Sequence, residues 1–405
     1  MRQRRTFAAA LLIAAVNLRL TVGAVPPVLG QIRSTTGLNS TAAGLLTATP
    51  VLCFGFAALA APLLIRRFSM GPLLSLTLLT VFCGCIVRLL PSVPPLFLGT
   101  VLLGCGIAIG NVLIPGLVKR DFPAQRVLMT ALYSVALSGG ATTAAGLTIP
   151  LEHAIGSGWR ITIAIWGVFA LLAFMLWTPH VRAEAAGHAQ AARAGEAAAP
   201  PVRGLWRDPL AWCVTGFMGF QSFEFYATLS WLPTIGRAQG MSAAHAGLLL
   251  SVSSFAGMFG ALTAPSLERR LKRARTAVVL CITLCAVGYL GLLLAPGSLT
   301  YVWCIIFGLG QGAPLALAMG YIVARTPDSR HAAQLSTMAQ SVGYMIASAG
   351  PFAMGALHGL SGGWSLPLVM LLVALIPMLV TGMVASQDRH VLAHRGRPLA
   401  ASQAR

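Results

Sequence analysis

The sequence predicts an all-α membrane protein whose twelve transmembrane helices form two six-helix bundles. Its 405 residues are 57% hydrophobic and only 9% charged, and the mean hydropathy of +0.79 lies outside the range of soluble domains. Apolar runs long enough to cross a bilayer recur along the whole chain. The second half repeats residues of the first in the same order, which indicates bundles related by a pseudo-twofold axis.

Twelve apolar runs of roughly 17 to 25 residues define the predicted spans. The first six cover approximately residues 7–30, 42–65, 72–90, 95–118, 127–150 and 161–178. The last six cover approximately residues 209–235, 244–267, 276–294, 299–323, 332–355 and 365–385. We therefore expect an N-terminal bundle over residues 1–178 and a C-terminal bundle over residues 209–386.

Two polar segments lie outside these bundles. Residues 179–208 are rich in alanine and glycine with scattered charges, a composition that predicts a partly disordered cytoplasmic linker. Residues 387–405 are polar and predict a frayed cytoplasmic tail.

The basic residues predict the orientation in the membrane. The net charge is +19, from 28 lysines and arginines against nine acidic residues. Most of the basic residues fall in connections on one side of the spans, which is the positive-inside pattern and not a nucleic-acid-binding surface. We therefore expect a multi-pass protein of the inner membrane with both termini in the cytoplasm. Arg88, three residues before Pro91 on the other side, is expected to extend to the outer surface, with a binding role as the alternative.

An internal duplication supports the two-bundle plan. Three ordered sets of residues match between the halves at shifts of about 203 to 205 positions. They are Pro62, Arg66 and Arg67 with Pro265, Arg269 and Arg270; Gly104, Gly106, Pro123 and Arg126 with Gly308, Gly310, Pro327 and Arg330; and His153, Gly158 and Trp159 with His358, Gly363 and Trp364. The two histidines, each in a repeated turn segment, are interpreted as structural and not as proton sensors.

Arg19 is the one lysine or arginine placed deep inside a predicted span, since Arg88 lies at the end of its own span. It lies about 18 Å along a helix that begins at Phe7, past the midplane of a hydrocarbon layer about 30 Å thick. Arginine keeps its proton there, and its insertion costs at least about 2.5 to 3.5 kcal/mol, so the guanidinium needs a partner or a water-filled cavity. We interpret it as the substrate-facing charge of a transporter; the alternative is a structural arginine bound to helix-end carbonyls or a neighbouring side chain.

Several short motifs along the chain carry a family resemblance. They are Asn17-Leu18-Arg19, Gly104 to Asn111, Lys119-Arg120-Asp121-Phe122-Pro123, Phe225-Tyr226, Trp231-Leu232-Pro233, Gly343-Tyr344 and Gly350-Pro351. In this order, on a doubled twelve-span plan, the chain resembles the cyanate and nitroimidazole transporter family of the major facilitator superfamily. The resemblance implies alternating access around a central cavity lined by spans one, four, seven and ten. The segment Leu64-Ile65-Arg66-Arg67-Phe68 departs from the wider superfamily because no aspartate precedes its arginines.

Glu224 is the one acidic residue well inside a span. It lies about 22 Å from the predicted start of its helix, near the depth of Arg19, so the two side chains could face each other across the cavity. We interpret Glu224 as a candidate for proton coupling or gating. A structural partner for Arg19 and a water-exposed position are the alternatives.

Other polar side chains in the spans are candidates for substrate binding because amides and hydroxyls in hydrocarbon need partners. Asn17 and Gln221 occupy equivalent positions of the two halves. The further candidates are Asn111, Tyr133, Tyr226, Gln311, Gln340 and Tyr344. Each could equally form interhelical hydrogen bonds, so the lining of the cavity stays open for these residues.

The leading functional prediction is a secondary active transporter of a small polar solute, an anion or weak acid that is cyanate-like, a carboxylate or a nitro-heteroaromatic compound, with proton coupling as a further expectation. Arginine favours planar, bidentate acceptors of this kind. The alternative is efflux of amphipathic drugs. No clustered catalytic set, ATP-binding loop or metal-ligand spacing is present, so we expect no enzyme, cofactor or metal site, and inert thiols at the eight cysteines. The expected partners are the substrate and the bilayer, with no nucleic acid, and the expected state is a monomer.

Overall fold

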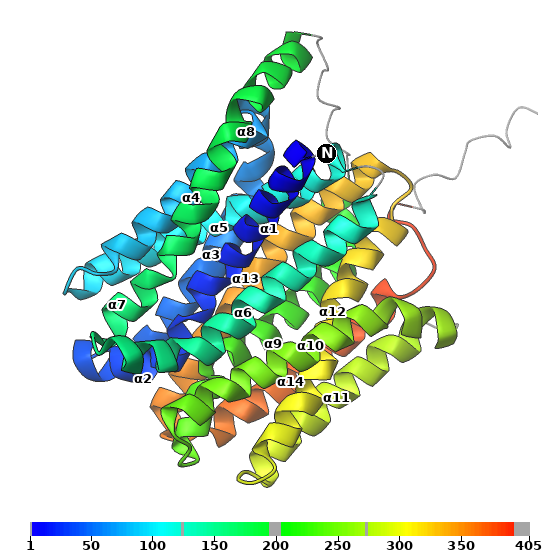
Figure 1. Ribbon diagram of the computed structural model, residues 1–405. Coiled ribbons are helices and arrows are strands. Elements are labelled where there is room, and N and C mark those ends of the chain that lie inside the picture. Colours follow the sequence, from blue (N-terminus) through cyan, green and yellow to red (C-terminus); the bar gives the residue numbers. More distant parts are fainter. Residues whose placement is uncertain (1, 123–124, 194–203, 272–273, 393–405) are drawn as a thin grey trace, which may run out of the picture.

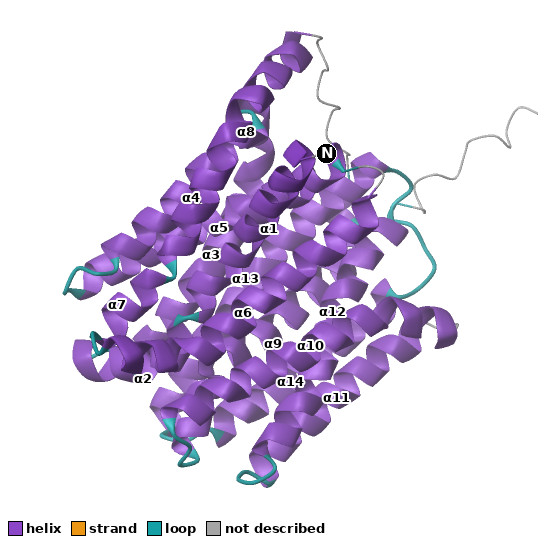
Figure 2. Ribbon diagram, in the orientation of Figure 1, coloured by secondary structure: helices purple, strands orange, loops and turns teal. Residues whose placement is uncertain are grey.

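The computed structural model describes residues 2–122, 125–193, 204–271 and 274–392, and throughout these ranges the chain is helical, with no strand (Figures 1 and 2). Nine helical stretches of this part are long and apolar enough to cross a membrane. The remaining three predicted spans correspond to the long helices α6, α9 and α13, whose bounds are given below. Every predicted span thus has a helix, and the all-α prediction is confirmed.

The N-terminal half contains eight helices. They are α1 (Arg2–Gly23), α2 (Val25–Thr36), α3 (Ser40–Arg67), α4 (Met70–Val87), α5 (Val93–Asp121), α6 (Arg126–Ile155), α7 (Gly158–Ile165) and α8 (Gly167–Arg193). The first predicted span is broken into α1 and α2 near Ala24, because Pro26 and Pro27 have no N–H to donate to the preceding turn. The sixth predicted span is divided at Trp166 into α7 and α8.

The C-terminal half begins with a short 3-10 turn, η2 (Leu205–Arg207). Its helices are α9 (Pro209–Ala238), α10 (Ala243–Leu271), α11 (Ala274–Leu294), α12 (Thr300–Ala324), α13 (Ser329–Ser361) and α14 (Ser365–Ala385). The Asp208 side chain caps α9 by accepting a hydrogen bond from the Ala211 backbone N–H at 3.0 Å, and Pro209 fits the first turn because it needs no N–H partner.

The duplication in the sequence is also present in the packing. A Cβ atom at Gly104 of α5 would lie 2.9 Å from the Pro50 Cα of α3, and the matching Gly308 of α12 packs against Ser253 of α10. Pro50 and Ser253 are themselves 203 positions apart, which is the shift found in the sequence. Within each half, the corresponding pair of helices is therefore in close contact at corresponding residues, and the glycines allow this close approach.

The two halves meet along α3 with α13, α6 with α10, and α2 with α9. A Cβ atom at Gly44 of α3 would lie 2.6 Å from the Pro351 carbonyl oxygen of α13, so the backbones are in close contact there. Ser251 of α10 donates a hydrogen bond to the Thr142 carbonyl of α6 at 3.0 Å. In Figure 1 the N-terminus lies at the end opposite to α2 and α7. Gly44, near the start of α3, shows that the halves are tightly packed towards the α2 end.

Three expectations about polar segments need correction. Helix α8 continues through Pro179 to Arg193, so the first part of the expected linker is helical, while residues 194–203 lie outside the described part of the chain. The expected frayed tail is bonded as far as Leu392, whose backbone N–H donates to Asp208 Oδ2 at 2.6 Å. Arg88 does not reach the outer surface; its residue is only 1% exposed.

Candidate functional site

The guanidinium of Arg19 lies between the two halves. Its Nη1 donates a hydrogen bond to the Tyr226 hydroxyl of α9 at 2.8 Å. The guanidinium carbon is 5.5 Å from the centre of the Phe225 ring and 5.4 Å from the centre of the Tyr226 ring, so both rings also contribute cation–π attraction. Arg19 keeps part of its surface accessible. The residue is thus held in place without being fully enclosed.

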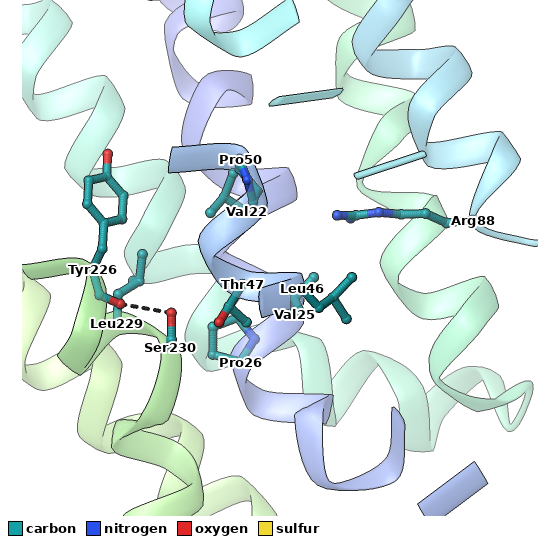
Figure 3. A pocket seen from close by; sticks show the side chains of 10 residues that line it. All are labelled: Val22, Val25, Pro26, Leu46, Thr47, Pro50, Arg88, Tyr226, Leu229 and Ser230. Atoms are coloured by element: carbon teal, nitrogen blue, oxygen red, sulfur yellow. Dashed lines mark hydrogen bonds between the residues drawn. The ribbon is translucent and has the colours of Figure 1, made fainter. Parts of the chain in front are cut away.

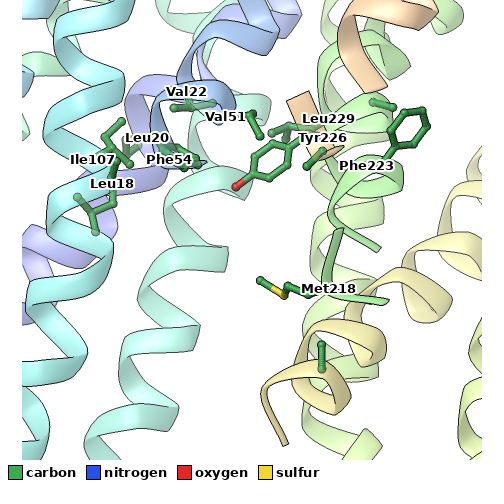
Figure 4. Packing of buried hydrophobic residues seen from close by; sticks show 14 of the residues in the cluster. Leu18, Leu20, Val22, Val51, Phe54, Ile107, Met218, Phe223, Tyr226 and Leu229 are labelled. Carbon is green, nitrogen blue, oxygen red and sulfur yellow. The ribbon is translucent and has the colours of Figure 1, made fainter. Parts of the chain in front are cut away.

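An aromatic cluster surrounds this contact. The ring centre of Phe54, on α3, is 6.1 Å from that of Tyr226 and 5.6 Å from that of Tyr344, on α13. Tyr226 and Tyr344 are 6.3 Å apart, and both tyrosines meet their neighbours edge-on. Figure 4 shows the Tyr226 ring extending from its helix towards Phe54. Three helices from both halves therefore form one wall of rings beside Arg19.

Tyr133 and Asn111 extend the polar part of the site within the N-terminal half. The Tyr133 hydroxyl, on α6, donates to Asn111 Oδ1, on α5, at 3.5 Å, a long hydrogen bond. Both residues are partly accessible. Tyr133, Tyr226 and Tyr344 all lie within electrostatic range of Arg19. Five of the residues predicted from the sequence, Arg19, Asn111, Tyr133, Tyr226 and Tyr344, are therefore gathered in one region.

Gln221 and Gln340 do not join this group. Gln221 Nε2 donates to Ser222 Oγ at 2.6 Å, and Gln340 Nε2 donates to Ser336 Oγ at 2.8 Å, so each amide bonds within its own helix. Each amide nitrogen thus finds its hydrogen-bond acceptor within its own helix, which favours a structural role for both residues.

Asn17 is fully buried two positions before Arg19, on another face of α1. Neither its amide nitrogen nor its amide oxygen has a hydrogen-bond partner within the described residues. Burying an amide without hydrogen bonds is costly, so Asn17 has both a donor and an acceptor available for a further partner.

Glu224 lies in a separate polar cluster inside the C-terminal half. It is 1% exposed, and neither carboxyl oxygen forms a hydrogen bond of good geometry within the described residues. The Tyr289 hydroxyl of α11 is its polar neighbour. Gln311 Nε2, on α12, donates to this hydroxyl at 2.7 Å and to Thr228 Oγ1 at 3.0 Å. Gln311 therefore belongs with Glu224 and not with Arg19.

The expectation that Glu224 and Arg19 face each other needs correction. Arg19 bonds to Tyr226, and residues two positions apart on a helix point in different directions, so Glu224 is turned away from that contact. No ion pair of the described residues involves either side chain. The guanidinium is therefore not neutralised by this carboxyl group, and an anion could take that role.

Sequence reasoning missed Phe54, Thr228 and Tyr289. Phe54 lies in a uniformly apolar run, where nothing distinguishes a ring that faces the site from one that faces lipid. Tyr289 is a single tyrosine in an apolar run, the same signal that identified Tyr133, and could have been found in the same way. Thr228 lies one helical turn after Glu224, where its hydroxyl can also bond to the preceding backbone.

Three relatives of this chain are named as transporters. It is 38% identical to the 2-nitroimidazole transporter of Escherichia coli (strain K12), over 96% of this chain and 98% of that protein. It is 30% identical to the cyanate transport protein CynX of the same organism, over 87% of this chain and 90% of that protein. An uncharacterized transporter of Bacillus subtilis (strain 168), YycB, is 37% identical over 93% and 92% of the two chains.

Solved structures with the same fold include a bacterial homolog of the human lysosomal transporter Spinster, inward-facing and occupied, with a TM-score of 0.75 and 18% identity over 95% of this chain and 97% of that one. The inward-open xylose transporter XylE from E. coli gives a TM-score of 0.73 and 12% identity over 97% and 98% of the two chains. The family model of the Major Facilitator Superfamily matches residues 9–351 of this chain. The chain is therefore a membrane transporter that belongs to the Major Facilitator Superfamily, and it is not an enzyme.

Proposed function

We propose that this secondary transporter moves a small anion or weak acid, with Arg19 as the electrostatic anchor of the substrate. The observation that carries the proposal is a guanidinium at the junction of the two halves that has a tyrosine hydroxyl and two aromatic faces around it, and no ion pair within the described residues. A cation in a low-dielectric site attracts an anion strongly, and the planar guanidinium suits carboxylate, nitro or cyanate groups.

The position of Arg19 also suits alternating access. Its hydrogen bond to Tyr226 joins α1 of one half to α9 of the other. A substrate anion that takes the Nη1 N–H now bonded to the Tyr226 hydroxyl displaces that hydroxyl. Substrate binding at this place would therefore be linked to how the two halves separate and approach.

The relatives support the substrate class. One is named for 2-nitroimidazole and another for cyanate. A nitroimidazole is a flat ring with an oxygen-bearing group, and it would suit the aromatic wall of Phe54, Tyr226 and Tyr344 together with the guanidinium. The same wall would also accept amphipathic drugs, which is the alternative function. The arginine beside the rings favours the anion or weak acid.

Glu224 is the proposed proton-coupling group. A carboxylate without a cation or a well-placed donor is very costly in such surroundings, so the site accommodates the protonated acid far better than the anion. Movement of the C-terminal half that admits water would favour release of this proton.

The proposed orientation places both termini in the cytoplasm and the protein in the inner membrane. The proposed bundles cover residues 1–178 and 209–386.

A ligand-stabilisation screen tests the proposal. Purified protein is heated with small anions, with nitro-heteroaromatic weak acids or with cationic amphipathic drugs, and its unfolding temperature is measured, because a ligand that binds only the folded state raises that temperature. We expect stabilisation by members of the first two classes and its loss in Arg19→Gln. Stabilisation by the cationic drugs alone, unchanged in Arg19→Gln, would favour drug efflux.

A further inference from the structure

A second arginine, Arg88, is buried at the end of α4 and has one guanidinium nitrogen, Nη1, without an acceptor. Its Nε and Nη2 donate to Thr100 Oγ1 of α5 at 3.1 and 2.8 Å. Its Nη1 is buried and has no hydrogen-bond partner within the described residues. The residue is 1% exposed. Since arginine stays protonated in proteins, a full positive charge is enclosed here, and both N–H groups of Nη1 lack an acceptor within the described residues.

The local packing explains why this side chain points inward. A Cβ atom at Gly99 of α5 would lie 2.8 Å from the Arg88 Cγ. Glycine at this position therefore leaves room for the aliphatic part of the Arg88 side chain. Arg160, on α7, donates to the Leu90 and Pro91 carbonyls at 2.7 and 3.2 Å and so fixes the turn after α4. With the turn fixed and the stem against α5, the guanidinium is directed towards the interior.

Arg88 lines a small cavity between the two halves (Figure 3). The other lining residues are Val22, Val25, Pro26, Leu46, Thr47 and Pro50 of the N-terminal half and Tyr226, Leu229 and Ser230 of α9. Figure 3 shows the Arg88 side chain extending towards the lining residues of α1, α2 and α3. Because Tyr226 also accepts a hydrogen bond from Arg19, this residue is shared by the cavity and the proposed substrate site.

No other group of the cavity compensates the charge. The Ser230 and Thr47 hydroxyls, which donate to the Tyr226 and Gly44 carbonyls at 2.8 and 3.1 Å, are uncharged and do not accept a hydrogen bond from Arg88 Nη1. None of the ion pairs formed by described residues includes Arg88. An enclosed cation without a counter-ion is strongly unfavourable, and an anion that accepts from Nη1 would relieve that cost.

We propose that Arg88 forms a second anion subsite, separated from Arg19 by Tyr226, which takes a small monovalent anion such as a halide or a linear pseudohalide. The cavity measures about 10 Å³, close to the space one water molecule needs, so as it stands it excludes a heteroaromatic ring, and an anion of three atoms enters only when the cavity widens. Its walls come from both halves, so it widens when they separate at this end. An anion entering there meets Arg88 before Arg19. This role rests on the proposed function of Arg19 and adds a place where the anion is held on the way.

Azide tests the subsite, because it is a stable linear anion of the same shape as cyanate and its infrared stretch reports the surroundings of each bound ion. Purified full-length protein in lipid nanodiscs is compared with Arg88→Gln and Arg19→Gln. We expect two bound-azide bands in the parent protein, with one lost in each variant. The band that survives in Arg88→Gln also shows that the variant is folded.

The outcomes separate this inference from the proposed function. A single parent band that disappears in Arg19→Gln and persists in Arg88→Gln overturns the second subsite and leaves the anchor role of Arg19 intact. Two bands that both survive Arg88→Gln overturn it as well. A parent protein without bound azide contradicts both proposals. Arg88→Lys keeps the charge but loses the planar fork, so it should retain a band at a shifted frequency, and a charge-independent structural role would give none.

Discussion

Arg19 Nη1 and the Tyr226 hydroxyl, 207 residues apart in the sequence, are joined by a 2.8 Å hydrogen bond between the two halves of the transporter. The bond connects the proposed charge for substrate binding to the helix that also carries Glu224, two positions away on another face. A substrate that engages Arg19 therefore acts on a contact that holds the halves together. Perturbing the two partners separately should affect different steps of transport.

Arg19→Ala should abolish transport, and Arg19→Lys should restore little of it. A hydrogen bond to a charged group contributes about 1.5 to 3 kcal/mol, so its loss weakens substrate binding by about ten- to a hundredfold. Lysine keeps the charge without the fork. Uptake of labelled substrate into proteoliposomes, normalised to inserted protein, measures the effect. Parent-level transport by Arg19→Ala would end the anchor hypothesis.

Tyr226→Phe should slow transport more than it weakens substrate binding. The ring remains in the aromatic cluster, while the acceptor for Arg19 is lost, at a cost of about 1 kcal/mol or roughly a fivefold effect. Tyr344→Phe is the matched control, because it belongs to the same cluster and its hydroxyl makes no hydrogen bond within the described residues. Initial rates over a range of substrate concentrations distinguish KM from the maximal rate. Equal losses in the two variants would contradict a special role for the Tyr226 hydroxyl.

The order of the helices was predictable because long apolar runs and their repetition are visible in one dimension. The direction of a side chain was harder to predict. The sequence placed Arg19 and Glu224 at a similar depth in the membrane, yet the Glu224 side chain points towards Tyr289. Its direction depends on how α9 is rotated about its own axis, which the depth does not reveal. Arg88 was expected to extend outward because it lies near a helix end, whereas Gly99 and Thr100 of a neighbouring helix create room and a partner for it inside. Such partners come from elsewhere in the sequence.

Cysteine labelling should show Ser92 and Arg389 on opposite sides of the membrane. Both residues are exposed, Ser92 between α4 and α5 and Arg389 after α14. The distribution of basic residues predicts that a cysteine at Ser92 reacts with an impermeant maleimide from outside, and one at Arg389 only after the membrane is opened. The parent protein, whose own cysteines all lie in helices, is the background control. The reverse pattern would overturn the proposed orientation.

Asp208→Ala should destabilise the protein and release the segment that precedes residue 393. One carboxyl oxygen caps α9 and the other accepts the Leu392 N–H, so the substitution removes a cap with a typical contribution of about 1 kcal/mol as well as a tertiary bond. Asp328→Ala is the control, because Asp328 caps α13 through His331 without holding the C-terminal segment. Carboxypeptidase digestion should proceed past Leu392 faster in Asp208→Ala alone. Equal rates in both variants would exclude this role of Asp208.

Glu224→Gln should separate binding from energy coupling. The amide resembles the protonated acid in shape and charge, so the buried site next to Tyr289 remains intact and the protein should still bind substrate at Arg19. Exchange of substrate across the membrane should continue, because it needs no net proton movement. Accumulation driven by an imposed proton gradient should be lost, because glutamine cannot take up and release a proton.

Tyr289→Phe serves as the comparison, since it removes the neighbouring hydroxyl and the acceptor of Gln311 but leaves the carboxyl group able to titrate. It should retain accumulation and shift its pH dependence, because the surroundings of the acid change. Paired measurements in proteoliposomes of substrate exchange and of accumulation under a proton gradient distinguish the two variants. Proton-driven accumulation by Glu224→Gln at the parent level would show that coupling uses another group, or a proton carried by the substrate itself.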